Sequence, residues 1–111
     1  MHELALAKDV LNKIKEAADK KGIGRASGAK VAIGETLISD PKEFEELFAA
    51  ASAGTAAQGM KLELEIIPLK AECADCTKEF DPKYKRFNCS ACGSMNIHII
   101  SGREIIIKEL Y

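Results

Sequence analysis

Two closely spaced cysteine pairs constrain the fold of this chain more than any other feature of its sequence. The two CxxC pairs enclose residues 77–88, and their four cysteines are Cys73, Cys76, Cys89 and Cys92. A tetrahedral zinc site needs four ligands at about 2.3 Å from the metal, and each CxxC turn can supply two thiolates. Too few apolar residues accompany these cysteines for an independent core, so a bound metal would supply the missing folding free energy. The spacing therefore predicts a small zinc-ribbon-like module.

This module is expected to be structural. Four thiolates close the coordination sphere of a tetrahedral ion and leave no position for water or substrate. A redox interpretation fits less well, because neither CxxC pair opens a helix after a buried strand. Iron also accepts tetrahedral sulfur ligands and stays as the alternative to zinc. His98 lies in a later apolar run, where strand alternation directs it away from the face of Ile97 and Ile99, so we expect it on the solvent side and not as a ligand.

Charge and hydropathy narrow the classes of partner. The chain of 111 residues suits one domain with a small appended module, and its 16 basic and 17 acidic residues leave a formal net charge of -1. Basic and acidic side chains also cancel between Glu72 and Gly93, which argues against a phosphate-binding surface. The start of the chain has no basic, apolar signal sequence, and no stretch is long and apolar enough to span a membrane. We therefore expect a cytoplasmic protein with neither nucleic-acid nor membrane partners.

Two amphipathic helices are predicted outside the cysteine region. Apolar residues recur at helical spacing from Glu3 to about Lys20. Asp40 can cap a second helix that starts with Pro41 and ends near Gly54. The residues assigned to the buried face are Leu4, Ala7, Val10, Leu11, Ile14, Ala17 and Ala18 in the first helix and Phe44, Leu47, Phe48 and Ala51 in the second.

Short alternating segments predict a sheet. The pattern indicates one strand at residues 30–33, a second over 61–68 and a third over 103–111. The last two flank the cysteine region. We therefore expect an α+β fold class, with two helices packed on a small mixed sheet and the zinc-ribbon-like module inserted before the final strand. Two helices cover one face of such a sheet, so its other face would be solvated or covered by a partner.

The tripeptide Met1-His2-Glu3 is the second feature with a chemical interpretation. The imidazole and backbone nitrogen of His2 and the free α-amine of Met1 can form one compact chelate, and nitrogen-rich planar sets suit Ni(II) or Cu(II). The alternative is that His2 is an ordinary exposed residue, because chain termini usually fray. Glu3 is explained equally well by the favourable electrostatics of a carboxylate in the first turn of a helix. The residues alone leave both interpretations open.

In their order along the chain, these motifs resemble the HypA family of nickel-insertion accessory proteins of nickel–iron hydrogenase. The resemblance covers essentially the whole chain. The initial Met-His-Glu in combination with the CxxC pairs is more specific than the pairs alone. The other matching segments are Ile-Gly-Glu at residues 33–35, Gly54-Thr55-Ala56 with Gly59, and Leu62-Glu63-Leu64.

The resemblance implies a nickel metallochaperone and not an enzyme. It implies a nickel-binding domain of residues 1–68 and 104–111, in which Met1, His2 and Glu3 hold exchangeable Ni(II) as cargo. It implies a zinc-binding domain of residues 69–103, with structural Zn(II) on Cys73, Cys76, Cys89 and Cys92. The implied partners are the maturation GTPase HypB and the hydrogenase large subunit, with urease as a further recipient in some relatives. The chain would act as a monomer or a homodimer.

The chain departs from some relatives in its histidines. Some carry histidines beside the CxxC pairs, and some archaeal relatives carry an extra nickel-ligand histidine in a longer segment between the pairs. Neither occurs here, so no ligand role is transferred to His98. The competing function is a zinc-ribbon adaptor or nucleic-acid-binding module whose N-terminus has no role. An enzyme ranks last, because no nucleophile–base pair or phosphate-binding glycine loop is present.

Overall fold

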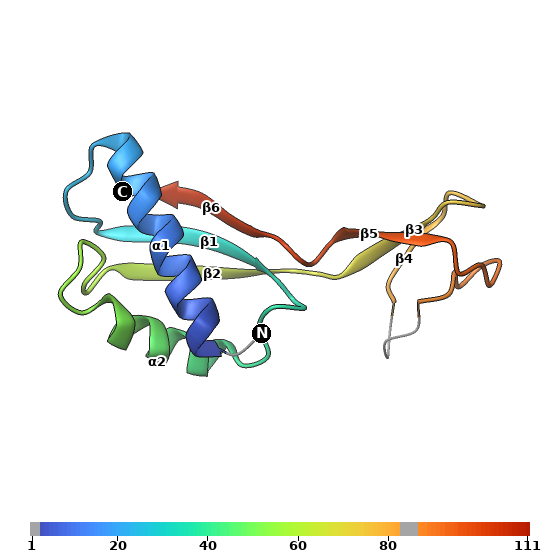
Figure 1. Ribbon diagram of the computed structural model, residues 1–111, viewed down its shortest axis with the longest axis horizontal. Coiled ribbons are helices and arrows are strands. Elements are labelled where there is room, and N and C mark those ends of the chain that lie inside the picture. The colour runs from blue at the N-terminus through green and yellow to red at the C-terminus, as the bar shows by residue number, and fades with distance from the viewer. Residues whose placement is uncertain (1–2, 83–86) are drawn as a thin grey trace.

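The computed structural model describes residues 3–82 and 87–111 and has two three-stranded sheets, one at each end of an elongated molecule (Figure 1). The principal extents are 52 × 27 × 17 Å. Both helices lie on the sheet that contains β1, β2 and β6 (Figure 1). The cysteines belong to the other sheet, of β3, β4 and β5, which follows β2 and precedes β6 in the chain. This arrangement confirms the predicted α+β fold with an inserted module.

Helix α1 (Glu3–Lys21) ends within one residue of the predicted boundary. Most of its predicted apolar face is buried, but Leu4 is 37% exposed and Leu6 is fully buried instead. The buried stripe is broad enough to include a residue that a strict helical spacing omits. Its apolar members are Leu6, Ala7, Val10, Leu11, Ile14 and Ala18.

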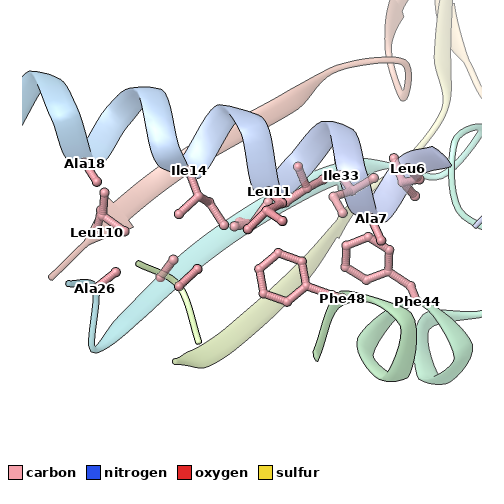
Figure 2. Close-up of a cluster of buried hydrophobic side chains, with 14 of the residues drawn as sticks. Leu6, Ala7, Leu11, Ile14, Ala18, Ala26, Ile33, Phe44, Phe48 and Leu110 are labelled. Atoms are coloured by element: carbon pink, nitrogen blue, oxygen red, sulfur yellow. The ribbon is translucent and has the colours of Figure 1, made fainter. Parts of the chain in front are cut away.

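Helix α2 (Pro41–Ser52) begins as its sequence predicts. The Asp40 side chain accepts hydrogen bonds from the backbone N–H groups of Lys42 and Glu43, at 3.1 and 3.2 Å, and thereby satisfies two of the N–H groups that a helix start leaves free. Figure 2 shows Phe44 and Phe48 of α2 pointing toward the apolar face of α1. Both phenylalanines are buried, so they fix α2 against α1.

The sheet under the helices is mixed. Strand β1 (Gly28–Gly34) is central, pairs in parallel with β2 (Lys61–Ile67) and pairs antiparallel with β6 (Ile105–Leu110). The face that the helices cover buries Val31 and Ile33 of β1. On the sheet, Lys108 of β6 donates a 2.8 Å hydrogen bond to Glu65 of β2, and both side chains are exposed. An exposed charged pair therefore joins the two outer strands of this sheet.

The second sheet is antiparallel throughout. Strand β3 (Lys70–Cys73) lies between β4 (Glu79–Phe80) and β5 (Ile97–Ser101). In the described part of the chain, no helix is both long and apolar enough to cross a lipid bilayer.

The loop between β1 and α2 braces the junction of the two sheets. Glu35 accepts a hydrogen bond from the backbone N–H of Leu69, and the hydroxyl of Thr36 donates a 2.6 Å hydrogen bond to the carbonyl of Gly102. Gly34 packs so closely here that an added Cβ would lie 2.2 Å from the carbonyl group of Gly102. Leu69 and Gly102 lie in the two segments that connect the sheets, so one loop holds both connections.

Candidate metal centre

The four cysteines converge on one point. Their Sγ atoms all lie within 4.8 Å of one another. The Cys73–Cys92 and Cys76–Cys89 pairs are separated by 3.7 and 3.5 Å. Tetrahedral zinc with bonds of about 2.3 Å would separate its sulfur ligands by about 3.8 Å. The donor set and its spacing therefore suit a tetrahedral ion such as zinc, as the two CxxC pairs predict.

Each CxxC pair lies in a backbone turn of the same form. In the first turn, the N–H of Thr77 donates to the carbonyl of Cys73 at 2.8 Å. In the second, the N–H of Gly93 donates to the carbonyl of Cys89 at 2.9 Å. Thr77 and Gly93 both have positive φ angles, of 63° and 74°. A left-handed backbone conformation is expected at Gly93, because glycine adopts it readily. It is not expected at Thr77, because a β-branched residue rarely adopts it.

Backbone donors lie against the Cys89 sulfur. The N–H groups of Cys92 and Ala91 donate to its sulfur and lower the pKa of the thiol from 9.0 to about 6. The Ala91 nitrogen lies 3.4 Å from Sγ of Cys89. Since metal ligation requires the thiolate, the backbone of this turn favours the form of Cys89 that could bind a metal.

A small apolar cluster supports the cysteines from one side. Cys73 and Cys89 are buried with Ala71 and Phe80, while the other two cysteines are exposed. Of the aromatic residues between the two CxxC pairs, Phe80 packs in this cluster and Phe87 is 44% exposed. Tyr84 lies outside the described residues. The apolar support is therefore narrow and includes two of the four clustered cysteines themselves.

A polar contact joins the two ends of the module. The Asp75 carboxylate accepts hydrogen bonds from the side chains of Ser94 and Asn96, which lower the pKa of Asp75 in that order of size. Asp75 lies inside the first CxxC pair, and both donors follow the second pair. The contact thus ties the turns together beside the cysteines.

His98 lies where strand alternation predicts. It is exposed on β5, while Ile97 and Ile99 pack against the apolar cluster of the cysteines. Its Nε2 atom is 3.6 Å from Oε1 of Glu72 on the neighbouring strand. His98 is therefore a surface residue of the module and does not belong to the cluster of four cysteines.

Of the predicted terminal site, the structure describes Glu3 alone, and Met1 and His2 lie outside the described residues. Glu3 is the first residue of α1 and is 5% exposed. Its Oε1 atom accepts hydrogen bonds from the backbone N–H and the hydroxyl of Ser39, at 3.1 and 2.9 Å. No sequence pattern indicates Ser39, because it lies 36 positions from Glu3 and belongs to no local motif.

Comparison with known proteins gives one consistent result. A family model described as hydrogenase/urease nickel incorporation, metallochaperone, HypA, matches residues 1–111. The hydrogenase maturation factor HypA of Chlorobium limicola is 31% identical over 110 residues, which are 99% of this chain and 95% of that protein. Its counterpart in Aquifex aeolicus is 33% identical over 110 residues, which are 99% and 96% of the two chains.

Solved structures resemble the whole molecule as well. The solution structure of the nickel metallochaperone HypA from Helicobacter pylori has a TM-score of 0.73 at 25% identity, with 99% of this chain and 96% of that chain covered. A second solution structure of a HypA protein has a TM-score of 0.67 at 25% identity, with 99% and 94% covered. The likeness therefore includes both sheets and is not confined to the cysteine module.

Proposed function

Since the chain belongs to the HypA family of nickel-incorporation metallochaperones that act in hydrogenase maturation, we propose that it carries one exchangeable Ni(II) ion at its own N-terminus. The proposed ligands are the α-amine of Met1, the backbone nitrogen and imidazole of His2, and Glu3. The observation that carries the proposal is the match to the family model from the first residue onward, which includes this tripeptide. A metallochaperone transfers its cargo and catalyses no reaction. Membership of this family therefore agrees with the expectation that the chain is not an enzyme.

The anchoring of Glu3 supports this location. A terminal chelate needs a rigid attachment, and the residue directly after the chelating His2 is buried at the start of a 19-residue helix. Leu6 and Ala7, in the next turn, are fully buried. The start of α1 is therefore a fixed point, and a chelate at the chain end could release its metal without unfolding the core.

We propose that the cysteine cluster holds a structural zinc ion. Cys73, Cys76, Cys89 and Cys92 would supply four thiolates, which enclose the ion and give the module its shape. The sulfur spacing supports this assignment. Metal analysis of the purified protein distinguishes zinc from iron. The proposal assumes a reducing compartment such as the cytosol, in which all four thiols stay available for metal.

The two sheets suggest the proposed domains. The nickel-binding domain would comprise residues 1–68 and 104–111, and the zinc-binding domain residues 69–103, so that each holds one three-stranded sheet. The recipient would be the hydrogenase large subunit, with the GTPase HypB as a partner in delivery. A monomer or a homodimer is compatible with the proposed delivery.

Nickel titration of the untagged protein tests the terminal site. We expect one Ni(II) per chain with the absorption spectrum of planar, nitrogen-rich coordination. His2→Ala should abolish this binding, and one residue added before Met1 should do the same, because it moves the α-amine away from His2. His98→Ala changes the only other histidine and is the matched control. Unchanged nickel binding by His2→Ala would show that the proposed site is wrong.

A further inference from the structure

The two carboxylate oxygens of Glu3 have different surroundings. Oε1 receives two hydrogen bonds from Ser39, whereas Oε2 is buried and has no hydrogen-bond partner within residues 3–82 and 87–111. A buried carboxylate oxygen without a partner costs folding free energy, so such groups call for an explanation. One oxygen is thus committed to the fold and the other is left available.

Ser39 is itself held on both sides. The preceding Ile38 is 8% exposed and belongs to the main apolar core. The following Asp40 caps α2, and its carbonyl accepts the Phe44 N–H at 3.0 Å. Further back in the same loop, Thr36 is bonded to Gly102 through both its backbone N–H and its hydroxyl. Both donors of Ser39 are therefore preorganised toward Glu3.

We propose that Ser39 is a positioning residue of the nickel site. Its two hydrogen bonds fix Oε1 of Glu3, so that Oε2 alone is offered to the bound nickel or to a water on it. This inference rests on the proposed terminal nickel site. Partners that orient a metal ligand through its second atom fix its geometry, and their loss commonly lowers metal affinity by about 10- to 100-fold.

The arrangement also suits a carrier. A carboxylate that binds through one oxygen adds charge neutralisation without the second bond of a bidentate ligand, so the ion stays exchangeable. The serine hydroxyl is the part of this arrangement that can be removed alone, because the backbone N–H of residue 39 stays after substitution. Ser39 is exposed, so its substitution does not open a cavity.

The test uses the untagged full-length chain with Ni(II) as the only ligand and a chromophoric chelator as competitor. Ser39→Ala should bind nickel about tenfold more weakly, with a changed nickel absorption spectrum and an unchanged zinc content. Ser39→Thr keeps the hydroxyl and should restore both affinity and spectrum. Ser101→Ala is the matched control, because it removes a serine hydroxyl that donates to the Pro68 carbonyl at 2.8 Å and not to Glu3.

The outcomes separate this inference from the proposed function. If His2→Ala loses nickel while Ser39→Ala matches Ser101→Ala in affinity and spectrum, the role of Ser39 is refuted and the terminal site stands. If His2→Ala retains nickel, the proposed function itself fails. A lower Tm in Ser39→Ala with unchanged nickel affinity makes Ser39 a purely structural residue. If Ser39→Thr binds nickel as weakly as Ser39→Ala does, the positioning role assigned to the hydroxyl is also overturned.

Discussion

The two ends of this molecule are stabilised by different means. The sheet under α1 and α2 has a continuous apolar core with two buried phenylalanines and six buried apolar residues from α1 alone. The cysteine module buries Ala71 and Phe80 with two of its own cysteines. One end is thus held by hydrophobic packing, and the other would depend on the ion that its four sulfur atoms suit. The two proposed metals would therefore have opposite relations to folding: zinc would hold a module together, and nickel would bind at the edge of a unit that is already folded.

Substitution of a cysteine should produce the largest difference in stability between the two ends. Cys73→Ser removes one of four ligands at a fully buried position, and structural zinc sites in small peptides contribute on the order of 10 kcal/mol to folding. We expect hydrogen-exchange protection to disappear in β3 and β5 while α1 stays protected. Ser90→Ala, an exposed position inside the second CxxC pair, is the control. Retained protection in β3 would mean that packing alone holds the module.

The converse change weakens the apolar end. Phe44 is fully buried, and Phe44→Ala should lower the free energy of unfolding of the helical unit by about 3–5 kcal/mol. Urea denaturation followed by helical circular dichroism measures this change, and the metal content should stay that of the parent. Phe87→Ala, at a position 44% exposed, should change stability by only about 0.5 kcal/mol. Equal losses in the two variants would contradict the apolar core as the main support.

The two CxxC turns allow a finer comparison inside the module. Thr77→Gly removes the backbone strain of a β-branched residue at positive φ, but it also removes the hydrogen bond that Thr77 donates to the Cys76 carbonyl. The net effect should be metal binding that is stronger by about 1 kcal/mol. Gly93→Ala should weaken it by a similar amount, since an added Cβ meets open space and only the backbone conformation opposes it. Competition with a metal chelator measures both. Changes of the same sign would disprove the equivalence of the turns.

The smallest change in stability is expected from the exposed Glu65–Lys108 pair on the sheet under α1 and α2. The hydrogen bond from Lys108, followed by its charge, lowers the pKa of Glu65. The pKa of Glu65 is lower in the folded state than in the unfolded state. The contact with Lys108 therefore stabilises the fold above the ordinary pKa of the carboxyl, and this stabilisation is lost as the pH falls through the lowered pKa. Glu65→Gln should therefore reduce Tm slightly at pH 7 and leave it unchanged once the pH lies below the lowered pKa. Glu63→Gln, whose contact to Lys61 is 3.9 Å, should change Tm less at pH 7.

Local patterns in the sequence predicted local structure well. The Asp40-Pro41 helix start and the alternation around His98 depend on neighbouring residues, and both occur as predicted. The convergence of the cysteines also follows from spacing, since each CxxC turn is local and only their meeting is long-range.

The features that sequence reasoning missed depend on contacts between distant segments. Leu6 is buried and Leu4 is not, because the positions of α2 and the sheet decide which edge of the α1 stripe is covered. The contact of Ser39 with Glu3 spans 36 positions, and the bond of Thr36 to Gly102 spans 66. No periodicity or motif encodes such pairs. Met1 and His2 stay a prediction from the sequence, supported by the family assignment.

The place of β6 in the chain has a consequence for the order of synthesis. This strand pairs with β1 and contributes Leu110 to the main core, yet it follows the whole cysteine module in the chain. A ribosome therefore delivers all four cysteines before it delivers the strand that completes the first sheet. The segment that begins with Glu3 is translated early, but its supporting sheet is finished only after the metal-binding module has emerged.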